Sequence, residues 1–288
     1  AENALMKMMV GNNSLHGTAI LMETATGKIK AIANLGKQAD GTYIEDLNYG
    51  VGKATEPGSI FKLATLMSLL EDKYVDMNTI VDCEGGAKYF YGLRIKDSHL
   101  GTGAITVKDA FLRSSNVAFA KLADQFYHSQ PSKFIDHLHK FRLDTLTGID
   151  ITASSGKPTI KKPTNRSWAN TTIPYMAHGY EELVTPLHML MLYNAVANNG
   201  VMMKPYLVNA IREYGVNVKT FQPQSYGKIC SDETLVQLRE CLGAVVDSAH
   251  GTGHRVLFDS AYSIAGKTGT AVTALDNRGY NKGNKIYQ

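Results

Sequence analysis

No stretch of this 288-residue sequence approaches the roughly 18 consecutive apolar residues that a membrane-spanning helix requires. The sequence starts at Ala1, and it lacks the basic head, apolar run and cleavage site of a secretory signal. Two interpretations fit, a natively soluble protein or a piece excised from a longer one. With 44% hydrophobic residues and no biased tract, the chain is expected to form one large domain or two small ones.

Cysteine is scarce, and the formal charge is only mildly positive. Cys83, Cys230 and Cys241 form no C-x-x-C pair and no cluster with histidine, so one disulfide plus a thiol and three buried thiols fit equally well. The net charge of +4 lacks the concentrated basic stripe of a nucleic-acid-binding protein. His137 and His139 fall on the polar side of a predicted helix, and no H-E-x-x-H motif occurs. We therefore expect no nucleic acid, metal or cofactor.

Strand and helix patterns are distributed unevenly along the chain. Runs at residues 17–23 and 28–34 flank a turn with glycine and predict a β-hairpin, and residues 263–272 predict a late strand. Helical patterns fill the middle, at residues 59–70, 107–112, 117–126, 131–141, 186–198 and 231–246. Strands at both termini around a mostly helical middle predict an α+β domain in which the terminal segments share one antiparallel sheet.

Ser59 and Lys62 stand three residues apart at the start of the first predicted helix. This spacing puts the hydroxyl and the amine on one face of the helix, where they can touch. Serine becomes a nucleophile when a base takes its proton, and lysine is such a base when burial lowers its pKa. Apolar residues cover every face of this helix, which predicts a buried Lys62. A capping serine and a solvent-facing lysine are the plain alternative.

Ser114-Ser115-Asn116 interrupts an apolar helical pattern. Such residues compete for backbone hydrogen bonds, so they predict a break between two helices with one of them capping the second. A functional interpretation adds a hydroxyl and an amide directed into a cleft.

Lys267-Thr268-Gly269 lies in the predicted late strand. A phosphate-binding loop is rejected, because that motif requires a glycine where Ala261 stands and no long helix is predicted afterwards. Along a strand, Thr268 and Thr270 share one face, so with Lys267 they can bind a substrate carboxylate. An edge strand protected by a lysine is the plain alternative.

The three motifs in this order resemble the signature set of the penicillin-recognising serine enzymes. The flanking Glu56-Pro57-Gly58, Gly179-Tyr180-Glu181 and residues 194–200 resemble class B penicillin-binding proteins, most of all the division-specific septal type. The resemblance runs from about residue 17 to residue 273. It implies the penicillin-recognising transpeptidase and β-lactamase-like fold. It also implies a peptidoglycan D,D-transpeptidase that cross-links stem peptides through a serine acyl-enzyme and is acylated by β-lactams.

The resemblance assigns catalytic roles to five residues. Ser59 is expected to attack the penultimate D-Ala carbonyl of a stem peptide, with Lys62 as the base. Ser114 and Asn116 are expected to relay a proton to the leaving group and to hold the acyl side chain. Lys267 is expected to support Ser114 electrostatically.

The resemblance also assigns substrate contacts to the third motif. Thr268, Gly269 and Thr270 are expected to bind the substrate, with the threonines holding its terminal carboxylate. The backbone N–H groups of Ser59 and Thr270 are expected to form the oxyanion hole. The acceptor amine is not revealed by the sequence.

The resemblance further implies that residues 1–288 are one transpeptidase domain truncated at its C-terminus. The membrane anchor, the N-terminal pedestal domain and the last strands of the family sheet are expected to be absent from it. The complete protein is expected to be anchored in the cytoplasmic membrane, with its catalytic domain in the periplasm and with divisome or glycosyltransferase partners. The alternatives are a D,D-carboxypeptidase, a serine β-lactamase, a non-catalytic β-lactam-sensing domain, and a structural protein whose motifs are only caps and breaks.

Overall fold

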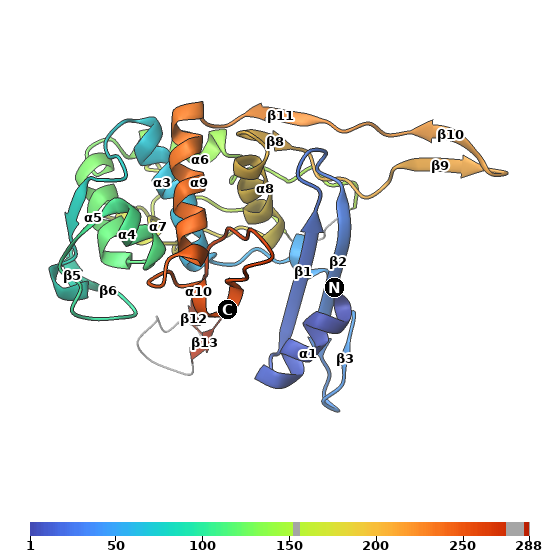
Figure 1. The fold of residues 1–288 in the computed structure, drawn as a ribbon, viewed down its shortest axis with the longest axis horizontal. Coiled ribbons are helices and arrows are strands. Elements are labelled where there is room, and N and C mark those ends of the chain that lie inside the picture. The colour runs from blue at the N-terminus through green and yellow to red at the C-terminus, as the bar shows by residue number, and fades with distance from the viewer. Residues whose placement is uncertain (152–155, 275–284, 288) are drawn as a thin grey trace. The chain divides into compact units, whose positions relative to one another are not determined.

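A computed structural model describes residues 1–151, 156–274 and 285–287 of the chain. These residues divide into two compact units (Figure 1). Unit 1 comprises residues 1–55, 142–158 and 184–229, and unit 2 comprises residues 56–141, 159–183 and 230–288.

Unit 1 contains the predicted hairpin. Strands β1 (His16–Met22) and β2 (Ile29–Lys37) pair antiparallel, and β3 (Tyr43–Ile44) adds to the free edge of β2. Helix α1 (Glu2–Asn12) packs on β1 and β2, and the short α2 (Tyr49–Gly52) packs beside β1 and α8 (Pro186–Ala197). Helix α8 begins as predicted, since the Thr185 side chain caps it and Pro186 occupies its first turn.

The remaining strands of unit 1 form two antiparallel pairs. Strand β8 (Val201–Met203) pairs with β11 (Ser225–Lys228), and β9 (Ala210–Glu213) pairs with β10 (Val216–Thr220). A chain reversal at Asn198 and Asn199 ends α8 and leads directly into β8.

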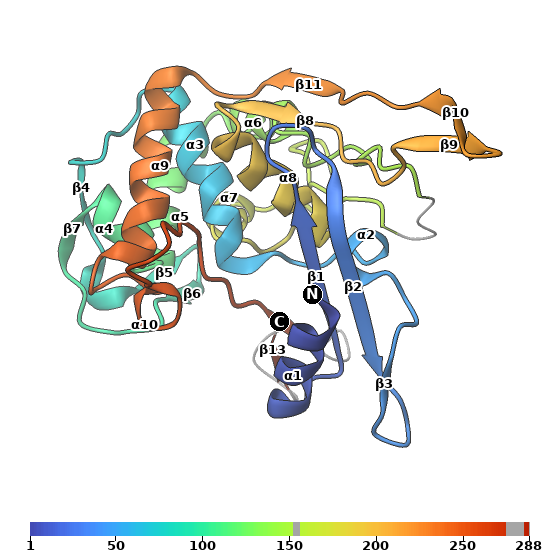
Figure 2. The ribbon, with the colours of Figure 1, turned by 45° about the vertical axis from the view of Figure 1, so that its right-hand side comes forward.

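Unit 2 is mostly helical and is built around one buried helix (Figure 2). That helix, α3, follows a single 3₁₀ turn that contains Ser59, and all its residues from Lys62 to Leu70 are buried. It packs against α5, α6 and α9, which explains why its sequence is apolar on every face. The helices of unit 2 are η1 (Gly58–Phe61), α3 (Lys62–Glu71), η2 (Glu84–Gly86), α4 (Val107–Leu112), α5 (Asn116–Tyr127), α6 (Pro131–Lys140), α7 (Thr172–Met176), α9 (Asp232–Asp247) and α10 (His254–Leu257).

Short antiparallel pairs complete unit 2. Strand β4 (Ile80–Asp82) pairs with β7 (Ala104–Thr106), β5 (Ala87–Phe90) with β6 (Leu93–Lys96), and β12 (Val272–Ala274) with β13 (Lys285–Tyr287). The mixture of helices and antiparallel strands confirms the predicted α+β class.

The late strand predicted for residues 263–272 is wrong except at Val272. The backbone N–H of Gly266 donates to the Leu242 carbonyl of α9, and Val272 N–H donates to the Tyr180 hydroxyl. A strand requires a ladder of backbone partners, and an apolar alternation alone does not provide one.

Among the described residues, β12 pairs with β13 while β1 to β3 form their own sheet, so a sheet shared by both termini is not formed.

Two expectations from composition have clear outcomes. Cys83, Cys230 and Cys241 are all buried thiols, which decides between the two possibilities left by the sequence. Across the described ranges, no helix combines the length and the apolarity needed to cross a bilayer.

Candidate active site

The position of Ser59 is fixed by close packing between the backbone of Gly58 and the backbones of Gly179 and Thr270. Gly58 precedes it with φ of +60°, and its N–H donates to the Gly179 carbonyl at 2.9 Å. A Cβ on Gly58 would lie 2.5 Å from the Thr270 carbonyl oxygen, and one on Gly179 would lie 1.9 Å from the Gly58 carbonyl oxygen. Glycine is therefore required at both positions, and the turn carrying Ser59 is held between the segments of Gly179 and Thr270.

Lys62 lies under Ser59 and is fully buried. Its Nζ contacts Ser59 Oγ at 3.0 Å, Ser114 Oγ at 3.1 Å, the Ser114 carbonyl oxygen at 2.8 Å and Asn116 Oδ1 at 2.6 Å. Burial, and secondarily the charge of Lys267, lowers the pKa of Lys62 well below the ordinary lysine value. An amine with a lowered pKa, next to a serine hydroxyl, can accept the proton of that hydroxyl.

The Ser114-Ser115-Asn116 segment forms the predicted break between α4 and α5. Ser114 has φ of +59°, and the Ser115 side chain caps α5. Asp97, which sequence reasoning missed, holds this break in place. It accepts hydrogen bonds from Ser115 Oγ at 2.8 Å, Asn116 N at 2.6 Å and Val117 N at 2.9 Å. The buried carboxylate thereby holds the backbone between Ser114 and Asn116.

The third motif joins the same cluster. Lys267 Nζ donates to Ser114 Oγ at 2.8 Å, and burial lowers the pKa of Lys267 to about 7. Thr268 Oγ1 lies 2.6 Å from Thr252 Oγ1. Gly269 packs on the side chain of Ile60, beside the turn that carries Ser59.

The structure therefore brings the three sequence-distant motifs together. Five predicted residues lie in one hydrogen-bonded cluster, namely Ser59, Lys62, Ser114, Asn116 and Lys267. The three other predicted residues, Thr268, Gly269 and Thr270, lie beside this cluster or beside the turn that carries Ser59. In the described part of the chain, no group of three or more histidine, cysteine and acidic side chains is placed to hold a metal ion.

Two buried titratable residues outside the three motifs, His178 and Glu182, lie near the turn that carries Ser59. His178 lies in the turn after α7 and is buried, and its burial and the charge of Lys62 lower its pKa to about 3. Glu182 is fully buried, and its carboxyl oxygens have no hydrogen-bond partner among the described residues. Burial, followed by the charges of Glu56 and Glu181, raises the pKa of Glu182 well above 4.5. His178 is therefore neutral in the folded chain at pH 7, and burial favours the neutral form of Glu182.

Replacing Glu182 by glutamine is expected to stabilise the chain increasingly as the pH rises above 4.5. The unfolded carboxyl loses its proton near pH 4.5, whereas the folded one keeps it, so wild-type stability falls with rising pH up to the folded pKa. Within that window the wild type loses about 1.4 kcal/mol per pH unit relative to the variant. Urea unfolding at pH 5, 6.5 and 8 measures the difference. Glu45→Gln, an exposed carboxyl, is the control, and a pH-independent difference for Glu182→Gln would contradict the expectation.

Comparison with known proteins agrees with this geometry. The family model of the penicillin binding protein transpeptidase domain matches residues 17–287. The chain belongs to this family. The match covers both units, and the family predicted from the three motifs is confirmed.

Over the aligned residues, individual relatives are about a quarter identical to the chain. Penicillin-binding protein PbpB of Mycolicibacterium smegmatis is 27% identical over 270 residues, which cover 88% of this chain and 40% of that protein. Peptidoglycan D,D-transpeptidase FtsI of Escherichia coli K12 is 26% identical over 278 residues, covering 94% of this chain and 44% of that protein. The chain thus spans less than half the length of these curated relatives.

Solved structures confirm the predicted penicillin-recognising fold. The crystal structure of penicillin binding protein 3 from Mycobacterium tuberculosis, complexed with aztreonam, superimposes with a TM-score of 0.80 at 24% identity. The match covers 96% of this chain and 64% of that one.

Proposed function

We propose that this chain is the catalytic domain of a peptidoglycan D,D-transpeptidase that acts through an acyl-enzyme on Ser59 and is acylated by β-lactams at the same residue. The observation that carries the proposal is the contact of 3.0 Å between the buried Lys62 amine and Ser59 Oγ. The name of the Escherichia coli relative and the aztreonam complex of the Mycobacterium tuberculosis protein support it.

Acylation begins with proton transfer from Ser59 Oγ to neutral Lys62. The oxygen attacks the penultimate D-Ala carbonyl, and the backbone N–H groups of Ser59 and Thr270 stabilise the negative charge that develops on the carbonyl oxygen. Ser114 Oγ, which contacts both lysine amines, passes a proton to the nitrogen of the terminal D-Ala. The C–N bond breaks, D-Ala leaves as a free amine, and an ester to Ser59 remains.

Deacylation uses the same groups in reverse. The amine of a second stem peptide attacks the ester, its proton passes through Ser114, and Ser59 recovers a proton as the new amide forms. Asn116 orients the acyl side chain, Lys267 stabilises the Ser114 oxygen, and Thr268, Gly269 and Thr270 bind the terminal carboxylate.

The same proposal includes the biological setting. Both units together are proposed to form one transpeptidase domain of the class B, septal type, working outside the cytoplasmic membrane. Membrane anchoring and contacts with divisome or glycosyltransferase partners belong to the proposal for the complete protein.

The test is to incubate the chain with a stem pentapeptide ending in D-Ala-D-Ala and with a fluorescent D-amino acid as acceptor. Liquid chromatography with mass spectrometry is expected to show release of D-Ala and formation of the exchanged peptide. Hydrolysis without exchange would indicate a D,D-carboxypeptidase, and rapid turnover of benzylpenicillin would indicate a β-lactamase. A penicillin adduct without any peptide turnover would indicate a sensor, and absence of both adduct and turnover would reject the whole proposal.

A further inference from the structure

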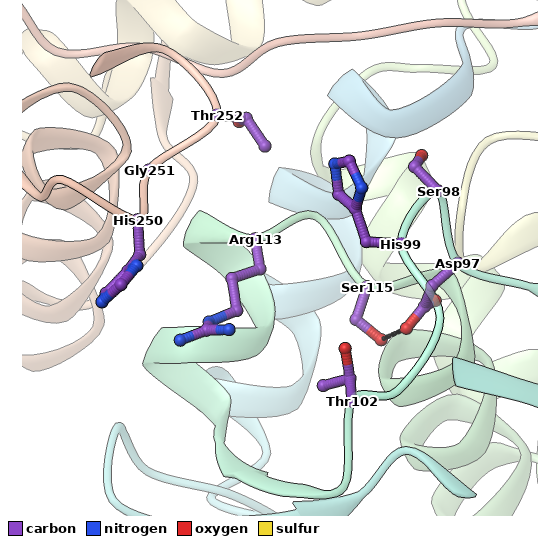
Figure 3. Close-up of a pocket in the computed structure, with 9 residues that line it drawn as sticks. All are labelled: Asp97, Ser98, His99, Thr102, Arg113, Ser115, His250, Gly251 and Thr252. Atoms are coloured by element: carbon purple, nitrogen blue, oxygen red, sulfur yellow. Dashed lines mark hydrogen bonds between the residues drawn. The ribbon is translucent and has the colours of Figure 1, made fainter. Parts of the chain in front are cut away.

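Figure 3 shows a pocket of about 290 Å³ in unit 2. Its walls come from the loop after β6, the end of α4 and the loop after α9. The side chains that give it its chemistry are Ser98, His99, Thr102, Arg113, His250 and Thr252. This volume suits a fragment the size of one amino-acid residue.

The pocket shares its inner wall with the catalytic cluster. Thr252 Oγ1 is hydrogen-bonded to Thr268 Oγ1 at 2.6 Å. The backbone N–H of Thr252 donates to the Leu112 carbonyl at 3.1 Å, which ties its loop to the end of α4, immediately before Arg113 and Ser114. A substrate group in this pocket would therefore lie next to the groups that handle the reacting peptide.

The charged groups of the pocket favour an anion. Arg113 is exposed, and its guanidinium has no ion pair or hydrogen bond with any described residue. In Figure 3 its side chain extends from the end of α4 toward the side of His250. The one carboxylate in the lining, Asp97, already accepts three hydrogen bonds from Ser115, Asn116 and Val117. The Asp97 carboxylate is thus occupied by hydrogen bonds within the protein, whereas the positive charge of Arg113 is available to a ligand.

Arg113 suits a carboxylate better than it suits a neutral group. A guanidinium offers donors in a planar fork that matches the two oxygens of a carboxylate. The hydroxyls of Ser98, Thr102 and Thr252 provide further donors around the pocket.

We propose that this pocket is a second carboxylate subsite, which binds a carboxyl group of a stem peptide other than the terminal D-Ala carboxylate, with Arg113 as the cationic partner. The proposal rests on the transpeptidase function proposed above and names a further contact of the same site. The carboxyl group can belong to the donor stem or to the acceptor stem, and the test distinguishes the two.

The test compares peptides that carry a side-chain carboxylate with otherwise identical peptides in which this group is a carboxamide. In one arm the donor pentapeptide is varied against a fixed acceptor, and in the other arm the acceptor is varied against a fixed donor. For the wild type, kcat/KM is expected to be about tenfold higher for the carboxylate form in one arm, as for a charge-assisted hydrogen bond. Arg113→Gln is expected to abolish this preference through KM, and Arg113→Lys to retain part of it.

Arg94→Gln removes an exposed arginine on β6 outside the pocket and should leave the preference unchanged. The readout is the ratio of kcat/KM between the two peptides. A general disturbance of the neighbouring Ser114 would lower both values equally and leave this ratio unchanged. An equal loss for both forms in Arg113→Gln, or no preference in either arm of the wild type, would overturn the subsite. Exchange with the carboxamide peptides would still proceed in that case, whereas failure of the transpeptidase proposal would abolish exchange with every peptide.

Discussion

Replacing Ser59 by alanine is expected to abolish the covalent adduct of benzylpenicillin completely. Ser59 Oγ is the atom that attacks in the proposed mechanism, and alanine removes it. Lys62 keeps its contacts with Ser114 and Asn116 in the variant, so the cost to stability should be only about 1 kcal/mol, the value of one hydrogen bond. Intact-mass spectrometry after incubation with the antibiotic measures the adduct, and peptide mapping of the wild type should place it on Ser59.

A matched control for Ser59→Ala lies on the helix that follows. Ser68 is a buried serine of α3 whose Oγ donates to the Ala64 carbonyl at 2.9 Å. Ser68→Ala should keep the adduct, because its hydroxyl serves only the helix. An undiminished adduct in Ser59→Ala would refute the assignment of the nucleophile.

Replacing Lys62 by methionine is expected to slow acylation by benzylpenicillin by about 10² to 10⁴, the usual contribution of a general base. Methionine has a side chain of similar length without an amine. This substitution leaves the acceptor atoms of Ser114 and Asn116 without their donor, but it also removes the cost of burying a polar amine. Stopped-flow measurement of the acylation rate with a fluorescent penicillin gives the effect directly.

The pH profile distinguishes a base from a purely structural lysine. Lys62 accepts a proton only in its neutral form, and its lowered pKa means that this form already accumulates well below pH 10.5. The wild-type acylation rate should therefore rise with pH below that value, and Lys62→Met should lose this rise along with the rate. The control is Lys121→Met, which removes a lysine of α5 that is paired with Glu84. If Lys62→Met kept the wild-type acylation rate and pH profile, the proposed role of Lys62 as the base would be contradicted.

The sequence predicted the elements whose signals are local. Helix α8 has its capping residue and its proline at adjacent positions, and three consecutive polar residues mark the break between α4 and α5. The burial of Lys62 followed from the apolar residues around it on one helix. In each case the information lies within one or two helical turns of the residue concerned.

Features that depend on distant partners were not predicted. Asp97 lies about twenty residues before the break that it anchors, and no local pattern distinguishes it from a surface carboxylate. His178 lies in a turn, and the residues next to it in the sequence give no sign that this turn is buried. The strand expected over residues 263–272 failed for a related reason, since hydrogen-bond partners rather than composition decide whether a strand forms.

The contact between Gly58 and Gly179 limits how the family site can vary in this chain. A single methyl group at either position would collide with main-chain atoms and displace Ser59. Substitutions at these two positions are therefore not available as a route to inhibitor resistance. Variation that preserves catalysis has to accumulate in the side chains surrounding them.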